Sequence, residues 1–219
     1  MADRRVGRGI VAGLESRWRE GDDPRAPLIV LLHGLTGDEN VMWIFEPAFP
    51  ASARLLALRA PFARPGGGFS WIDPEHGPMP DIPAFADAAH AIADAAAETL
   101  RGEPDRSLVL AGFSQGAALA LSAAALGILH PDAVIALAGI LPIGDLTGLP
   151  SVPIFWAHGK KDVVVPVERA RRDIERLRQA GASLTYCEAD TGHKLGAECF
   201  QGLRQWFAGL SLDHPPSVA

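Results

Sequence analysis

The chain has 219 residues, 48% of them hydrophobic, and a formal net charge of −6. This length and apolar content allow a large buried core, in one α/β domain or in two small ones. The negative charge argues against nucleic acid as a partner, because no basic excess is available to neutralise phosphates.

The N-terminus and the cysteines indicate the compartment. Arginines near the N-terminus resemble the start of an export signal, but charged residues from Glu15 onward interrupt the apolar run that a signal peptide needs. No stretch approaches the roughly 18 apolar residues of a membrane span. We therefore expect a cytoplasmic protein without stable membrane insertion. Cys187 and Cys199 allow one bridge, but reduced core thiols are the favoured interpretation.

Short apolar runs alternate with longer amphipathic segments along the chain. Runs that are apolar on both faces are typical of central strands in a covered parallel sheet. In chain order, this pattern predicts strands at residues 27–32, 54–58, 107–111, 133–138, 152–157 and 183–187.

Helical spacing of apolar residues predicts the segments between the strands. One helix covers 83–100, one follows residue 116, one runs from near Pro166 to Gly181, and the last covers about 195–210. This alternation predicts one doubly wound, mostly parallel α/β domain over residues 1–219. Roughly the first 25 residues form an N-terminal strand region, and about the last nine form a proline-containing tail.

The segment Gly112-Phe113-Ser114-Gln115-Gly116 lies between a predicted strand and a predicted helix. A G-x-S-x-G sequence in this context is typical of the nucleophile elbow of an α/β-hydrolase, in which a tight turn lifts the serine above the sheet. The flanking glycines are needed because side chains there would collide with the neighbouring strand and helix. The pattern predicts Ser114 as a nucleophile.

A nucleophilic serine needs a base and an acid that orients the base. Of the seven histidines, His193 follows the last predicted strand and precedes the last helix, where this fold places its base. Asp162 lies between Ser114 and His193 and follows the strand at 152–157. Asp162 could instead cap the next helix, but a gap of four residues before Pro166 makes it a poor cap. We therefore predict a catalytic triad of Ser114, Asp162 and His193.

The loop from His33 to Asp38 follows the first central strand and carries two glycines. An oxyanion hole needs two backbone N–H groups, which we assign to Leu35 and Gln115. The alternative is a plain glycine-rich turn. Gly66-Gly67-Gly68 lacks the spacing of a phosphate-binding loop. No His, Cys or Asp spacing resembles a metal site, and no cofactor is predicted.

Three motifs together resemble the phospholipase/carboxylesterase family: the stretches 33–37, 112–116 and 158–166. The resemblance covers about residues 26–210. It implies a cofactor-free esterase for acyl esters or thioesters, with the triad and hole assigned above. Residues 59–73 are nearer to the bacterial carboxylesterases of the family than to its thioesterases. Lys194, directly after His193, is not a residue that the family pattern predicts.

The connection at 139–151 is too short for a lid domain, so we expect an open site. Apolar residues on nearby loops predict an acyl groove for short to medium chains, although each could instead be core packing. These residues are Leu35, Trp71, Phe69, Leu141, Ile143 and Val164.

We therefore expect a carboxylesterase with a small-molecule ester as its substrate. Lysophospholipase and thioesterase activities, which would use the same triad, are the alternatives, and a non-catalytic ligand receptor of this fold is a further one. The sequence leaves a monomer or a homodimer open.

Overall fold

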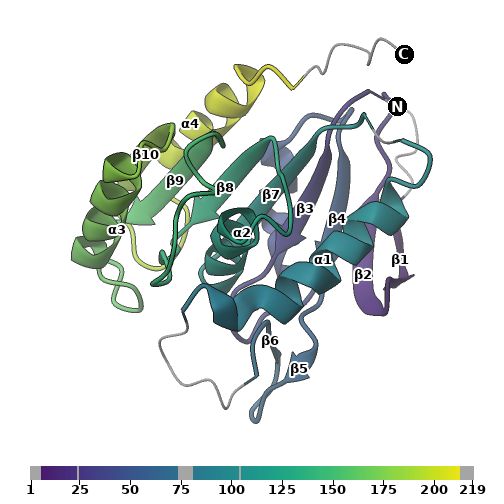
Figure 1. Ribbon diagram of the computed structural model, residues 1–219, viewed down its shortest axis with the longest axis horizontal. Helices are drawn as coiled ribbons and strands as arrows, with labels where there is room; N and C mark the ends of the chain where they lie inside the picture. The colour runs from purple at the N-terminus through teal and green to yellow at the C-terminus, as the bar shows by residue number, and fades with distance from the viewer. Residues whose placement is uncertain (1–5, 24, 74–80, 104, 213–219) are drawn as a thin grey trace.

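The computed structural model describes residues 6–23, 25–73, 81–103 and 105–212. An eight-stranded sheet has the order β1-β2-β4-β3-β7-β8-β9-β10 (Figure 1). The strands from β4 to β10 in this order pair in parallel, and β1 and β2 pair antiparallel at one edge. Their bounds are β1 Val6–Val11, β2 Leu14–Arg19, β3 Leu28–Leu32, β4 Arg54–Leu58, β7 Leu108–Phe113, β8 Ala133–Leu137, β9 Ile154–Gly159 and β10 Leu184–Ala189.

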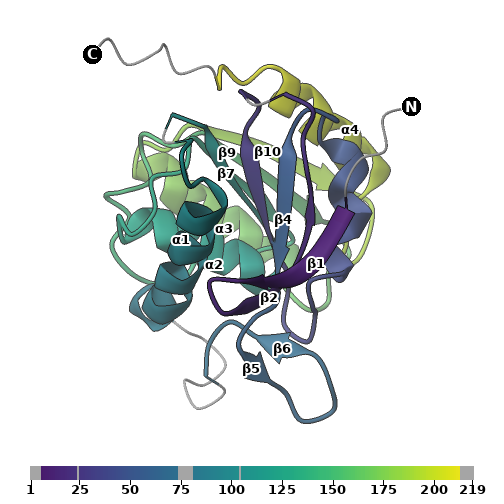
Figure 2. The ribbon, with the colours of Figure 1, turned by 90° about the vertical axis from the view of Figure 1, so that its right-hand side faces the viewer.

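Helices cover both faces of the sheet, as Figures 1 and 2 show. One face carries α1 (Ala86–Thr99), preceded by the 3₁₀ turn η3 (Pro83–Phe85), together with α2 (Gln115–Ala125) and α3 (Val167–Gln179). The other face carries α4 (Ala197–Ala208) and the 3₁₀ segment η1 (Val41–Ala48). The doubly wound, mostly parallel fold is confirmed. The predicted tail lies outside the described residues from residue 213 onward.

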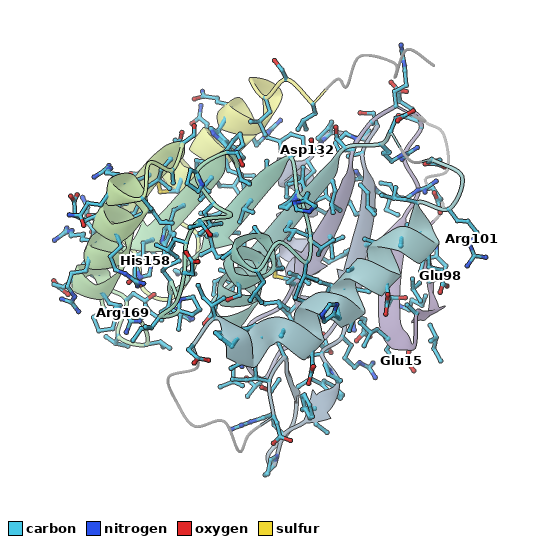
Figure 3. All side chains as sticks on the ribbon, in the orientation of Figure 1. Glu15, Glu98, Arg101, Asp132, His158 and Arg169 are labelled. Carbon is cyan, nitrogen blue, oxygen red and sulfur yellow. A yellow bond between two sulfur atoms is a disulfide. The ribbon has the colours of Figure 1, made fainter. Side chains whose placement is uncertain are left out.

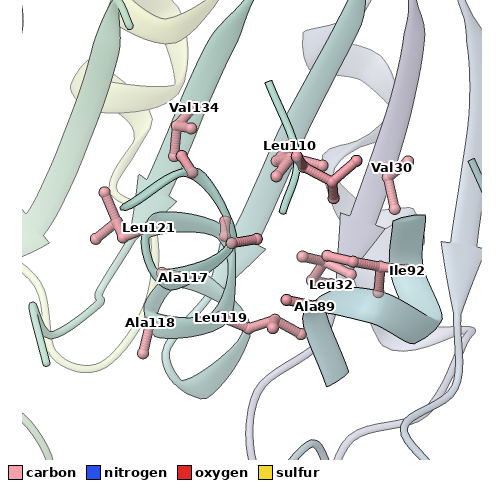
Figure 4. Close-up of a cluster of buried hydrophobic side chains, with 14 of the residues drawn as sticks. Val30, Leu32, Ala89, Ile92, Leu110, Ala117, Ala118, Leu119, Leu121 and Val134 are labelled. Carbon is pink, nitrogen blue, oxygen red and sulfur yellow. The ribbon is translucent and has the colours of Figure 1, made fainter. Parts of the chain in front are cut away.

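The helices form where apolar residues recur at helical spacing. On η3 and α1, the apolar residues Phe85, Ala89, Ile92 and Ala96 recur at helical spacing and are buried, and Leu100 at the end of this face is partly buried. Figure 4 shows this face meeting α2 and strand residues such as Val30. The two helices can approach closely because their contact surfaces are rich in alanine.

Polar contacts fix the edges of this core. The Glu98 carboxylate on α1 accepts a hydrogen bond from the Ala12 amide in the β1–β2 turn (3.1 Å). At the start of β8, the Asp132 carboxylate accepts one from the Leu108 amide of β7 (2.8 Å). Figure 3 labels both acidic residues. The first contact attaches the N-terminal hairpin, which the sequence predicted only as a strand region.

The carboxyl ends of the parallel strands meet at one edge of the sheet, and the loops that follow them form the site. Residues 138–153, between β8 and β9, contain neither helix nor strand, so no lid covers this edge from that connection. A small hairpin, β5 (Phe62–Ala63) with β6 (Phe69–Ser70), projects there (Figure 2).

Cys187 on β10 and Cys199 on α4 form a disulfide, with Cα atoms 5.7 Å apart. The expectation of reduced thiols is therefore wrong for this structure. The sequence separation of 12 residues gave little indication of pairing. The fold pairs them because α4 packs against the edge strand that precedes it. The bridge encloses the loop that carries His193.

Reduction of this disulfide should lower the free energy of unfolding by about 3 kcal/mol, the loop-closure value for a short loop of roughly this length. Urea unfolding with and without a dithiol reductant measures the difference. A variant with both Cys187→Ala and Cys199→Ala is the control, because its unfolding should not respond to the reductant. An unchanged wild-type midpoint on reduction would contradict the prediction.

Candidate active site

Ser114 stands on a tight turn between β7 and α2. It has φ 52° and ψ −113°, a positive φ that non-glycine residues rarely adopt. A Cβ on Gly116 would strike the backbone carbonyl of Leu32 in β3, and a Cβ on Gly112 would strike the backbone of Gly116. The turn is held by a hydrogen bond from the Ser114 amide to the Leu137 carbonyl (2.8 Å). This is the geometry that the G-x-S-x-G sequence predicts.

Asp162 and His193 come from separate loops and meet directly. The His193 ring nitrogen Nδ1 lies 2.7 Å from Asp162 Oδ2, and Oδ1 accepts hydrogen bonds from the amides of Val164 (2.9 Å) and Val165 (2.8 Å). The Asp162 side chain is fully buried. Because a carboxylate only accepts, Nδ1 carries the proton in this pair, and Nε2 of neutral His193 is left as an acceptor.

The pair lies beside the serine turn. The His193 ring packs on that of Phe113, the residue before Ser114, with ring centroids 4.9 Å apart. The Ser114 hydroxyl and the His193 ring are not hydrogen-bonded to each other in the structure. Such contacts are often long in an empty site and shorten when substrate is bound.

Two backbone amides near Ser114 are available to a ligand. Those of Leu35 and Gln115 have no acceptor within the described part of the chain. A Cβ on Gly34, the residue before Leu35, would lie 3.2 Å from the Ser114 Cβ, so a side chain there would crowd the serine. The residues predicted to form the oxyanion hole therefore border the predicted nucleophile.

His33 holds the base of this loop. Its Nε2 accepts a hydrogen bond from the Ala60 amide (3.0 Å), so Nδ1 carries the proton and donates to the Gly34 carbonyl (2.7 Å). Burial lowers the pKa of His33 and keeps it neutral. His158, at the end of β9, makes a similar local contact with the Val165 carbonyl (2.8 Å).

A partly buried ion pair holds the far end of the loop. Arg59 donates two hydrogen bonds to Glu39, at 2.7 and 3.0 Å, and its guanidinium lies over the Phe69 ring, 4.8 Å from the centroid. Hydrogen bonding from Arg59 holds the pKa of Glu39 below its usual value. Phe69 in turn exchanges backbone hydrogen bonds with Thr36 and Gly37 (2.9 and 3.0 Å).

Arg59→Lys should lower kcat about tenfold with little change in KM. Lysine cannot reproduce the two-point contact with Glu39, so the Leu35 amide would be less well placed for a charge that forms only in the transition state. Steady-state kinetics on a 4-nitrophenyl ester measure the effect. Arg171→Lys is the control, because Arg171 forms an equivalent two-point pair with Glu188 (both 2.7 Å) away from this loop. Equal effects in both variants would contradict the prediction.

Two residues predicted for the acyl groove are instead part of the core. Trp71 is 1% exposed, and its indole N–H donates to the His33 carbonyl (2.8 Å), while its amide donates to the Gln115 side chain (3.0 Å). Leu141 is fully buried, with its amide bound to Asp173 (2.9 Å). The prediction that they line an open groove is wrong. Through its indole N–H, Trp71 instead holds the start of the loop at His33.

Of the remaining groove candidates, Leu35 lines the pocket next to the serine, and the other three lie outside it. Ile143 and Val164 are largely exposed, and Phe69 is half-buried beneath Arg59. The pocket itself has a volume of about 470 Å³ and lies between the 34–37 loop, η1 and residues 193–195. Its apolar walls, which the sequence reasoning missed, are Val41, Met42, Ile44, Phe45, Phe113 and Leu195. The uninterrupted apolar run at 41–45 was the available signal.

The sequence model of the family described as Phospholipase/Carboxylesterase matches residues 16–208. This chain belongs to that family. A probable inactive carboxylesterase of rice (Oryza sativa subsp. japonica) is 26% identical over 200 residues, which cover 79% of this chain and 78% of the relative. Acyl-protein thioesterase 1 of Debaryomyces hansenii is 25% identical over 186 residues, with coverages of 72% and 79%.

Solved structures of carboxylesterases share the fold of this family member. The Mesorhizobium loti enzyme has a TM-score of 0.76 at 22% identity, covering 94% of this chain and 99% of the other. The Bacillus cereus enzyme also has a TM-score of 0.76, at 19% identity, with coverages of 89% and 93%. These likenesses show the α/β-hydrolase fold.

The site of this family member combines a serine, a hydrogen-bonded acid–base pair, two available amides and an apolar pocket. That set is suited to nucleophilic attack on an acyl group. Within the described residues, no three His, Cys, Asp or Glu side chains gather as a metal site requires. No described helix has the length and apolar character to cross a membrane.

Proposed function

We propose that this chain is a serine carboxylesterase that hydrolyses short- to medium-chain acyl esters through an acyl-enzyme. The Asp162–His193 hydrogen bond beside the Ser114 turn carries the proposal, because it leaves Nε2 of His193 as the acceptor that a serine nucleophile needs. Membership of the phospholipase/carboxylesterase family supports it.

In the proposed reaction, the Ser114 hydroxyl attacks the ester carbonyl carbon while His193 Nε2 takes its proton. The Leu35 and Gln115 amides donate hydrogen bonds to the oxyanion, and Asp162 stabilises the imidazolium. The tetrahedral intermediate collapses when His193 returns the proton to the leaving alkoxide. Water, deprotonated by His193, then attacks the acyl-enzyme and releases the carboxylic acid and free Ser114.

The pocket bounds the size of the acyl group. Met42 and Phe45, both buried, form part of its wall. Only the part of the acyl chain that fits inside this pocket is removed from water. Each buried methylene contributes about 0.8 kcal/mol, close to fourfold in binding, whereas one in solvent contributes almost nothing. We expect kcat/KM to rise from acetyl to roughly butyryl or hexanoyl esters and then to level off.

A series of 4-nitrophenyl esters from acetyl to palmitoyl tests the activity and the length limit together. Val41→Trp, which adds bulk at the pocket, should lower the ratio of hexanoyl to acetyl kcat/KM about tenfold, as the loss of one or two buried methylenes predicts. Val163→Trp is the matched control, because Val163 is 90% exposed and does not line the pocket. No hydrolysis of any ester would refute the proposed function, and a steady rise to palmitoyl would refute the length limit.

Two other functions have a specific observation in their favour. The Debaryomyces relative is an acyl-protein thioesterase, so matched oxygen and sulfur esters should be compared in the same assay. The rice relative is described as probably inactive, which would suit a ligand receptor. Here the serine, the acid and the base are all present, and a receptor would not need all three.

The cytoplasmic location stays a prediction, as does the choice between monomer and homodimer. The Cys187–Cys199 disulfide favours an oxidising compartment, where such bonds persist. Mass spectrometry of the protein isolated from its own cells under thiol-trapping conditions would decide the redox state.

A further inference from the structure

The pocket beside Ser114 has one Lys or Arg side chain, Lys194, among its described lining residues, most of which are apolar or glycine. Lys194 directly follows His193 and is exposed. Its amide donates to the Gly192 carbonyl (2.8 Å), and the next residue, Leu195, lines the same pocket. The lysine is therefore held at the same opening as the predicted base.

Within the described part of the chain, no acidic side chain neutralises this lysine. Among the described residues, no carboxylate lies within ion-pair distance of Lys194. By contrast, Lys161 pairs with Asp190 at 2.8 Å. Asp38, an acid on the loop that forms the opposite wall, directs its Oδ1 to the amides of Asn40 (2.8 Å) and Val41 (3.2 Å).

The local charge is opposite to that of the whole chain. The chain has a net charge of −6, which repels anions at long range, yet the pocket presents a lone ammonium group beside apolar walls. An apolar surface next to an unpaired cation matches a ligand with an aliphatic chain and one anionic group.

We propose that Lys194 forms an anion subsite that selects esters whose aliphatic acyl arm ends in a carboxylate, the half-esters of dicarboxylic acids. The proposal rests on the proposed esterase function and extends it to a substrate class. The methylenes occupy the apolar wall, and the terminal carboxylate lies near the Lys194 ammonium.

The kinetic test compares 4-nitrophenyl hydrogen adipate with 4-nitrophenyl hexanoate, which has a methyl group where adipate has its carboxylate. Non-enzymatic hydrolysis is subtracted for each ester. Lys194→Met should lower the adipate-to-hexanoate ratio of kcat/KM about fivefold, the upper range for an exposed ion pair. Lys194→Glu should lower this ratio further, whereas Lys194→Arg, which keeps the positive charge, should leave it near the wild-type value. Salt should reduce the ratio in the wild type and leave it unchanged in Lys194→Met.

Lys160→Met is the matched control. Lys160 is another exposed lysine near the site, but it does not line the pocket, so its removal should leave the ratio within about twofold of the wild type. If the ratio fell equally in Lys160→Met and Lys194→Met, the two lysines would act through long-range electrostatic attraction and not through a subsite. That result would overturn the proposal. An unchanged ratio in Lys194→Met would overturn it as well.

A binding measurement separates this proposal from the proposed function. Calorimetry on Ser114→Ala, with and without Lys194→Met, gives the affinities for monomethyl adipate and methyl hexanoate without turnover. A preference for the adipate ester that disappears with Lys194 supports the subsite even if the wild type hydrolyses nothing, a result that would refute only the esterase. The absence of any such preference overturns the subsite, whatever the esterase assay shows.

Discussion

Ser114→Ala should lower kcat for 4-nitrophenyl butyrate by a factor on the order of 10⁶, as loss of a nucleophilic serine does in enzymes of this type. The remaining rate would reflect binding and the two amides alone. The protein should stay folded, because the turn at Ser114 is held by backbone hydrogen bonds to Leu137 and Ala117 that alanine keeps. Circular dichroism and urea unfolding check the fold.

Covalent labelling identifies the nucleophile directly. A fluorophosphonate should modify the wild type at Ser114 and leave Ser114→Ala unlabelled. Ser122→Ala is the matched control, because this serine is buried in α2, the helix that follows Ser114, and its hydroxyl has no partner in the described structure. Labelling that persists in Ser114→Ala, or a decrease in kcat of less than about tenfold, would place the nucleophile elsewhere.

Asp162→Asn should lower kcat by about 10⁴. The Val164 and Val165 amides both donate to Oδ1, so the single oxygen of an asparagine would face them. Its NH₂ group would then face His193 Nδ1 and donate to it. The imidazole proton would move to Nε2, and no acceptor would remain for the Ser114 hydroxyl.

The tautomer is measurable apart from activity. Nitrogen NMR of His193 should show the proton on Nδ1 in the wild type and on Nε2 in Asp162→Asn. Asp190→Asn is the control, because Asp190 lies in the loop of His193 but is exposed and pairs only with Lys161 among the described residues. A decrease in kcat of less than about tenfold in Asp162→Asn would assign the orienting acid to another residue.

Local patterns in the sequence determined the layers of the fold and the position of the elbow. On α3, which was predicted from near Pro166 to Gly181, the apolar residues at helical spacing are all buried, because this spacing defines the face that avoids water. These residues are Val167, Ala170, Ile174 and Leu177. The two elbow glycines were predicted to avoid collisions, and the backbone of β3 and α2 does fill the space around them. Such features depend on near neighbours in the chain.

Chain order also predicted the pairing of Asp162 with His193. In a parallel sheet, every strand ends at the same edge, so residues that follow β9 and β10 lie close together whatever their separation in sequence. The 2.7 Å contact between Asp162 and His193 agrees with that reasoning.

Only the tertiary structure decided the pocket and the cysteines. An uninterrupted apolar run such as 41–45 has no periodicity that indicates which side faces a cavity. Trp71 was predicted to line an open groove, but its indole N–H donates to a carbonyl 38 residues away, so its burial depends on a partner that the local sequence does not reveal. The disulfide likewise depends on how α4 packs against β10. Contacts between distant segments depend on how the layers pack, and a single sequence carries no local signal for that packing.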